Sequence, residues 1–155
     1  MSKQSDCLFC KIARKEINAY EIYRDKAMVA FLDIAPIRPG HVQIIPLEHY
    51  AYFDDLPTDL AASMMQLGQR IAKVQKQICY VDRVALLFTG GDIPHAHAHL
   101  VPMHEKTDIT SRRYIAEENI TFCSTPRASG EELSAMAERL AQALGQKGVF
   151  LPNQV

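Results

Sequence analysis

The chain has 155 residues, a length typical of one domain with its own hydrophobic core. Hydrophobic residues make up 48% and charged residues 23%, the balance of a soluble globular protein. The formal net charge of −1 disfavours long nucleic acids as partners, although a small phosphorylated ligand needs only local donors. The chain has no apolar run near the ~18 residues that span a bilayer, and its polar start lacks the apolar core of a signal peptide. We therefore expect one cytoplasmic domain over residues 1–155, with neither membrane nor nucleic acid as partner.

Short apolar runs predict five strands. Residues 34–40, which carry two prolines and one glycine, predict a loop between the second and third strands. A tight loop at residues 89–92 separates the last two strands. The fourth run, residues 84–88, is too apolar to face water. The predicted strands cover residues 21–24, 28–33, 41–46, 84–88 and 94–102.

Two segments have the three- and four-residue apolar spacing of amphipathic helices. The longer covers residues 58–79, with Thr58 or Asp59 as its cap. The second covers residues 131–144 and ends at Gly145. Strands and helices follow one another without regular alternation, which indicates an α+β fold with a mostly antiparallel sheet.

Three histidines alternate with alanine at His95, His97 and His99. On a strand these side chains would share one face, about 6.5 Å apart per step, while Ala96 and Ala98 would pack on the other. Buried imidazoles need partners, so a chance occurrence on an apolar strand is disfavoured. Two functional interpretations remain. The histidines could bind a catalytic metal, or one could attack as a nucleophile while its neighbours orient it and stabilise charge.

Two of the four cysteines form a Cys-x-x-Cys pair, Cys7 and Cys10. In a reducing compartment this spacing favours metal or redox chemistry over a structural disulfide. A disulfide and an unbonded pair remain open alternatives. Cys79 and Cys123 are interpreted as ordinary buried or half-buried cysteines.

Four collinear segments resemble those of the histidine triad (HIT) family. Residues 7–12 resemble its opening segment, 31–36 its nucleoside-contacting strand end, 39–50 its central hairpin, and 94–102 its signature of histidines alternating with apolar residues. The resemblance covers about residues 6–102 and leaves 103–155 as a C-terminal extension with one helix. It implies a HIT-like fold, with a mostly antiparallel five-stranded sheet, a long helix and a C-terminal helix.

The resemblance also implies an activity: hydrolysis or transfer at a nucleoside 5′-α-phosphate through a nucleotidyl-histidine. His97 would attack phosphorus through Nε2, which requires that a backbone carbonyl hold its Nδ1–H. His99 and His41 would donate hydrogen bonds to charge that grows in the transition state. The implied substrates are purine nucleoside phosphoramidates or dinucleoside polyphosphates, and no catalytic cofactor is required.

The same resemblance implies a nucleotide pocket. Asp33 would accept hydrogen bonds from the ribose hydroxyls at the mouth of this pocket. The base would lie among apolar side chains at positions that match the family: Leu8, Phe9, Ile12, Ile17, Phe31 and Ile34.

Many family members bind a structural zinc ion, and most are homodimers. The matching zinc ligands here are Cys7, Cys10, His49 and His95. Two thiolates and two imidazoles suit a closed tetrahedral Zn²⁺ site, whose role is in folding and not in catalysis. A homodimer would pair through the long helix and a strand, although the apolar stripe of that helix could equally cover the sheet.

The loop before the histidines departs from the family pattern, which usually has a longer turn with an Asn and a Gln. Thr89 and the backbone amides of Gly90 and Gly91 could still donate to a phosphate. The carboxylate of Asp92 would repel a phosphate unless it is protonated, paired or used to handle a leaving-group proton. An enzyme is therefore the leading hypothesis, and a nucleotide-binding or partner-binding protein with vestigial catalysis is the alternative. A catalytic metalloenzyme is disfavoured, because no carboxylate stands at ligand spacing within the strand.

Overall fold

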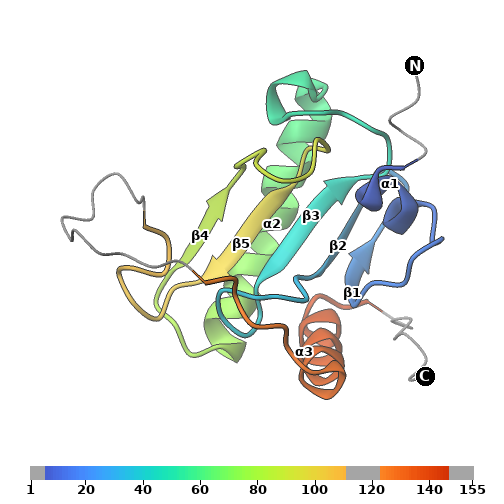
Figure 1. Cartoon of the computed structure of the whole chain (residues 1–155). Helices are drawn as coiled ribbons and strands as arrows, with labels where there is room; N and C mark the ends of the chain where they lie inside the picture. The colour runs from blue at the N-terminus through green and yellow to red at the C-terminus, as the bar shows by residue number, and fades with distance from the viewer. Residues whose placement is uncertain (1–5, 111–122, 147–155) are drawn as a thin grey trace.

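The structure of the chain is a computed structural model that describes residues 6–110 and 123–146. Within these ranges it contains three α-helices, five strands and one 3₁₀ turn (Figure 1). In chain order the elements are α1 (Leu8–Ala13), β1 (Glu21–Arg24), β2 (Met28–Leu32), β3 (Val42–Pro46), η1 (Phe53–Asp55), α2 (Thr58–Ile78), β4 (Val84–Leu87), β5 (Ala98–Pro102) and α3 (Gly130–Ala143). None of these described helices is both long and apolar enough to cross a membrane.

The five strands form one antiparallel sheet in the order β1-β2-β3-β5-β4. Helices α2 and α3 pack on one face, and the short helix α1 lies on the other (Figure 1). This is the predicted α+β fold with a mostly antiparallel five-stranded sheet, and the prediction is confirmed.

Each face of the sheet carries its own apolar cluster. The larger cluster joins residues such as Ile44 and Leu100 to the buried sides of α2 and α3. The smaller cluster joins Phe9 and Ile12 of α1 to Phe31 and two further strand residues. Because helices cover both faces of the sheet, the central strands are buried on both sides. Successive side chains of a strand alternate between faces, so every second residue faces α1, the helix that carries Cys10.

The α2 face of β5 is closely packed, as the small residues of the sequence predict. Ala98 of β5 is buried there at 1% exposure, and Ala96, two residues before the strand, is buried on the same side at 3%. Gly68 of α2 lies against this face, and a Cβ on it would come within 2.6 Å of Leu86 Cδ1. The histidines between the alanines are thereby left on the opposite side.

The predicted strands match closely except for the last. Strand β5 begins at Ala98 and not at Pro94. Proline has no N–H for the ladder, and the next two amides bond elsewhere. His95 N–H donates to the Ile93 carbonyl (2.8 Å), and Ala96 N–H donates to the Tyr50 carbonyl (2.7 Å). His95 and His97 therefore lie in the segment that leads into β5, outside the ladder.

The two long helices are close to the prediction, with differences at their ends. The N-cap of α2 is Pro57, and neither Thr58 nor Asp59 takes that position. Helix α3 ends as predicted, with Gly145 at φ +75° just after it. Helix α1 and turn η1 were not predicted, because six and three residues are too few to show an apolar period. Cys123 is exposed, which corrects its assignment as a buried or half-buried cysteine.

Candidate active site and metal cluster

The three alternating imidazoles lie on the α1 face of the sheet, as the spacing predicts. The Phe9 ring packs edge-on against His95 and His97, with centroids 5.9 and 5.1 Å apart. The ring centroids of His97 and His99 are 4.8 Å apart. The row is buried at its first two members, since His95 is 0% and His97 is 6% exposed.

One nitrogen of His97 is held by the backbone. Its Nδ1 lies 2.6 Å from the carbonyl oxygen of His95. A carbonyl can only accept, so Nδ1 carries the proton and donates it. The lone pair of His97 is therefore on Nε2, which is the nitrogen that a nucleophilic role requires.

His41 and His99 form a directed hydrogen-bond chain. The Ile37 amide donates to His41 Nδ1 (3.2 Å), so the proton of neutral His41 is on Nε2. His41 Nε2 then donates to His99 Nδ1 at 3.0 Å. The proton of neutral His99 is therefore on its own Nε2, where it can be donated to a ligand.

Burial keeps this pair neutral. Desolvation lowers the pKa of His99 to about 4, and its histidine neighbours act on the pKa in the same direction. Desolvation also lowers the pKa of His41, against the opposing charge of Asp33. Both imidazoles act as hydrogen-bond donors through N–H and not as cations.

Asp33 lies directly after β2, next to the hydrogen-bonded pair of His41 and His99. Its Oδ1 accepts from the Ala35 amide at 2.8 Å, and its Oδ2 accepts from Gln43 Nε2 at 2.6 Å. Its Oδ2 also lies 3.9 Å from His41 Nδ1. Sequence reasoning missed Gln43, although a single polar residue inside the apolar strand 42–46 is a signal that could have found it.

The predicted base-contacting residues divide into two groups. Phe9, Ile12 and Phe31 are buried within the α1 cluster, where Phe9 and Phe31 meet edge-on at 5.8 Å. The other three are large apolar side chains that remain exposed: Leu8 (44%), Ile17 (37%) and Ile34 (43%). The buried group can form the floor of an apolar pocket, and exposed apolar residues can line its mouth.

The loop between β4 and β5 lies on the other side of His97. Thr89, Gly91 and Asp92 lie at the surface, whereas Gly90 packs against the ring of Tyr52. A cavity of about 210 Å³ lies between this loop and residues 51–54, and His97 lines it. The charge of Asp92 acts on His99 in the direction that raises the pKa of the imidazole.

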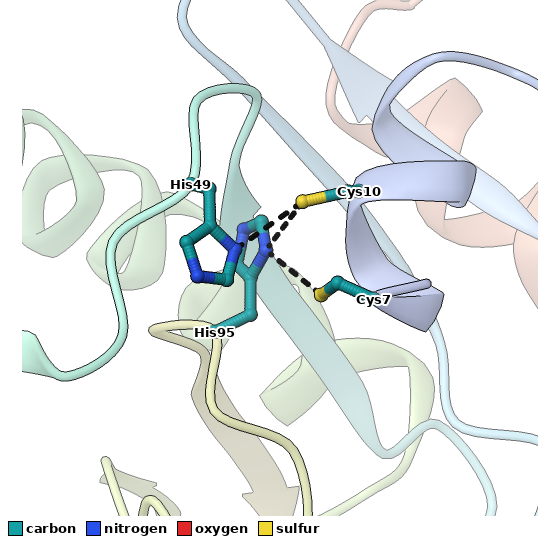
Figure 2. A group of neighbouring side chains, drawn as sticks. All are labelled: Cys7, Cys10, His49 and His95. Atoms are coloured by element: carbon teal, nitrogen blue, oxygen red, sulfur yellow. Dashed lines mark hydrogen bonds between the residues drawn. The ribbon is translucent and has the colours of Figure 1, made fainter. Parts of the chain in front are cut away.

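A second cluster joins α1 to the lead into β5. Cys10 of α1 and Cys7, the N-cap of that helix, approach His49 and His95, as Figure 2 shows. Cys7 Sγ and Cys10 Sγ each lie 3.5 Å from His95 Nδ1, and Cys10 Sγ lies 3.3 Å from His49 Nδ1. All four ligand atoms lie within 4.8 Å of one another.

The geometry of this cluster fits a tetrahedral zinc ion. Zn–S and Zn–N bonds of about 2.3 and 2.0–2.1 Å place sulfur and nitrogen ligands roughly 3.6 Å apart. His95 Nε2 donates to the Pro46 carbonyl at 3.1 Å, which leaves Nδ1 unprotonated for a metal. Burial and the neighbouring Cys7 thiol raise the pKa of Cys10 to about 11, so a thiolate here needs a cation to stabilise it.

Comparison with known proteins agrees with this geometry. The HIT domain family matches residues 14–106, more than half of the chain. The chain belongs to the HIT family. Adenosine 5′-monophosphoramidase HNT1 of Saccharomyces cerevisiae is 34% identical over 105 residues, which are 64% of this chain and 64% of the yeast protein. This family thus includes a nucleotide hydrolase.

Solved structures of HIT proteins are similar over nearly the whole chain. A Hit-like protein involved in cell-cycle regulation from Bartonella henselae is 25% identical, with a TM-score of 0.74 over 92% of this chain and 99% of that one. A Zn-bound histidine triad family protein from Mycobacterium smegmatis is 26% identical, with a TM-score of 0.69 over 92% and 95%. The Cys/His cluster described above is compatible with a structural zinc of this kind.

Proposed function

We propose that this HIT protein cleaves nucleoside 5′-phosphoryl bonds by covalent catalysis on His97. The observation that carries the proposal is the 2.6 Å hydrogen bond from Nδ1–H to the His95 carbonyl. This bond fixes the tautomer whose Nε2 is free to attack. It also gives the ring a partner for the positive charge that it acquires when Nε2 bonds to phosphorus.

The reaction has two displacements at phosphorus. In the first, the lone pair of His97 Nε2 attacks the α-phosphorus. The bond from phosphorus to the leaving group breaks, and the leaving group departs with the electron pair and is protonated from solvent. In the second, water attacks the same phosphorus, the P–Nε2 bond breaks, and its electron pair returns to His97 as the nucleotide is released with loss of one proton from the water. Another acceptor in place of water would give transfer instead of hydrolysis.

The His41–His99 pair would stabilise the transition state. His99 Nε2–H is the last donor in the row of hydrogen bonds that begins at the Ile37 amide and passes through His41. A donor fixed in advance costs little reorganisation when charge grows on a phosphoryl oxygen or on the leaving atom. Thr89 and the amides of Gly90 and Gly91 could supply further donors from the loop between β4 and β5.

The nucleoside would bind on the α1 side of His97. Asp33 would accept from the ribose hydroxyls, and the base would rest among the apolar residues of α1, β2 and the adjoining loops. The yeast relative is named for an adenosine monophosphoramidase activity, which supports a purine nucleoside phosphoramidate as substrate. Dinucleoside polyphosphates contain the same type of α-phosphorus and are the other substrate class that we propose to test.

We propose that the cluster of Cys7, Cys10, His49 and His95 binds one structural zinc ion per chain. When bound, the ion would tie α1 to the segment that carries His97. The donor set offers no open coordination position, so the ion would take no part in the displacement. Metal analysis of the purified protein tests this directly.

We also propose that the protein forms a homodimer through α2 and β4. Strand β4 is at the edge of the sheet and is only half-buried although all four of its residues are apolar. On α2, Met65 is 48% exposed. A second copy on this edge would cover unpaired backbone groups and apolar surface together, and analytical ultracentrifugation would detect it as a mass of two chains.

The decisive test of the catalytic proposal is the variant His97→Asn. We expect it to lower AMP release from an adenosine phosphoramidate or from diadenosine tetraphosphate by ~10³-fold or more. The exposed histidine His104 provides the matched control, and His104→Asn should retain full activity. Equal low activity in the wild type and His97→Asn would instead favour a nucleotide-binding protein with vestigial catalysis, an alternative that the exposed carboxylate of Asp92 near the site keeps open.

A further inference from the structure

A buried glutamine lies beside the proposed nucleotide site, bonded to Asp33. Gln43 is 8% exposed and lies in register between Phe31 on β2 and His99 on β5. Its side chain therefore shares the sheet face on which the proposed base-binding and catalytic residues lie. The other residues of this strand are apolar, so the packing of the strand alone does not explain a glutamine at this position.

The amide of Gln43 is satisfied at one end only. Nε2 donates to Asp33 Oδ2 at 2.6 Å, a short hydrogen bond to a carboxylate. Oε1 is buried and has no hydrogen-bond partner among the described residues. The opposite orientation of the amide would turn Oε1 toward the carboxylate and remove the bond, so the contact with Asp33 fixes the orientation. A buried polar atom left unpaired lowers stability, so the unpaired Oε1 offsets part of what the bond to Asp33 contributes to the core.

Asp33 is held in place largely by this contact. The Ala35 amide fixes Oδ1 at 2.8 Å, and Gln43 fixes Oδ2. His41 Nδ1 is farther away, at 3.9 Å from Oδ2, and already accepts from the Ile37 amide. Without Gln43 the carboxylate would be fixed at one oxygen only and could rotate about its side-chain torsions.

We propose that Gln43 is a positioning residue that holds Asp33 for two ribose hydroxyls and so makes the site selective for ribonucleotides. This inference rests on the proposed function. A carboxylate with one oxygen bonded to Ala35 and the other to Gln43 keeps lone pairs in fixed directions for both hydroxyls. A sugar that lacks these hydroxyls leaves a charged acceptor unpaired, which is a strong basis for discrimination.

The test compares Gln43→Met with Gln75→Met. Methionine matches the size of glutamine and removes the amide. Gln75 is buried too, at 0% exposure, and also has an unpaired Oε1, but its Nε2 donates to the carbonyls of Gly40 and Leu100 and not to a site carboxylate. We would measure kcat/KM for an adenosine 5′-phosphoramidate and for its 2′,3′-dideoxy analogue, together with Tm.

In Gln43→Met we expect kcat/KM for the ribose substrate to fall about 10- to 100-fold, mainly through KM. The value for the dideoxy analogue should change less than about 2-fold, so the preference for ribose collapses. The Tm of Gln43→Met should change little, because the variant loses one hydrogen bond and one unpaired acceptor together, whereas Gln75→Met loses two bonds for one such acceptor. Gln75→Met should lower Tm and keep the wild-type preference.

Two results with Gln43→Met would overturn the inference. An unchanged ribose preference in Gln43→Met would show that Asp33 does not depend on Gln43. A lower Tm with equal losses on both substrates would show a structural role only. If the wild type cleaves neither substrate, only the catalytic proposal fails. Calorimetric binding of AMP and 2′,3′-dideoxy-AMP to the same variants then tests whether Gln43 sets the preference for ribose. Absence of AMP binding to the wild type would overturn both.

Discussion

The glycine before His41 provides a quantitative test of how this histidine is presented. Gly40 has φ +90°, and a Cβ there would lie 2.8 Å from Cys79 Sγ. The left-handed conformation costs an L residue about 1–2 kcal/mol. Overpacking against a buried side chain typically costs about 1–3 kcal/mol. After a small gain from the stiffer unfolded chain, we expect Gly40→Ala to lower the free energy of unfolding by about 2–4 kcal/mol.

Two other glycines separate the two contributions. Gly145 has φ +75°, and a Cβ added there would have no neighbouring atom within 4 Å, so Gly145→Ala measures the backbone contribution alone. Gly91 has neither a positive φ nor such a neighbour within 4 Å, so Gly91→Ala should be neutral although it lies near the site. In a chain of this length 1 kcal/mol corresponds to about 2–4 °C in Tm. Thermal unfolding should therefore rank the variants as Gly91, Gly145 and Gly40, in order of increasing loss.

The same substitution should reduce activity. A shift of the backbone at Gly40 moves His41, whose Nε2 lies 3.0 Å from His99 Nδ1. The double variant Gly40→Ala/Cys79→Ala should recover the packing part of the loss and leave the backbone part. If Gly40→Ala is no more destabilising than Gly145→Ala, the contact with Cys79 relaxes at no cost and the reasoning is refuted.

Three further predictions concern the metal, the histidines and α3. Cys10→Ser should reduce bound zinc from about one ion per chain and lower Tm, whereas His97→Asn should keep the metal, and metal lost with His97 would favour a catalytic ion instead. Burial lowers the pKa of His99 to about 4 in the folded protein, whereas in the unfolded chain the pKa of this imidazole is about 6.5. As the pH falls below about 6.5, the unfolded chain therefore takes up a proton that the folded protein does not. Stability should thus fall as pH drops from about 6.5 to 4, less so in His99→Asn, and a Tm that rises on acidification would contradict this. Ser129→Ala removes the Oγ that caps α3 and should cost about 1 kcal/mol in chemical unfolding, while an unchanged midpoint would show that the cap contributes nothing.

Periodicity predicted most of the fold because it reports burial directly. Strand β1 and helix α2 agree with their predicted ranges to within one residue. The start of β5 was wrong because it depends on where the Ala96 amide finds its acceptor, and that acceptor belongs to Tyr50. A contact between segments so far apart in the chain leaves no local pattern. The short helix α1 has the same limitation, since a single turn and a half contains no repeat.

The candidate site was less accessible to sequence reasoning than the fold. Spacing alone left Cys7 and Cys10 as a metal or redox pair, and only the family resemblance added His49 and His95. The structure brings the four together across 88 positions of the chain. The sequence could not predict which ring nitrogen of His41 carries the proton, because the Ile37 amide sets this tautomer. Such partners are fixed by tertiary packing and not by residue type.

The tautomers explain why histidines two positions apart can do opposite work. His95 donates from Nε2 to the Pro46 carbonyl and turns Nδ1 toward the cysteines. His97 donates from Nδ1 to the His95 carbonyl and is left with Nε2 for attack. His95, a member of the proposed metal cluster, therefore also supplies the carbonyl that fixes the proton position of His97, the proposed nucleophile.

His95 would thus connect the proposed metal cluster to the proposed chemistry at phosphorus. If the cluster loosens, the His95 carbonyl moves and the proton of His97 loses its fixed acceptor. We expect Cys10→Ser to lower kcat for an adenosine phosphoramidate by about 10-fold, the scale on which supporting contacts change activity, even at temperatures where the variant remains folded by circular dichroism. Full kcat in folded, metal-depleted Cys10→Ser would show that the His95 carbonyl is held by the Pro46 contact and the β5 backbone alone.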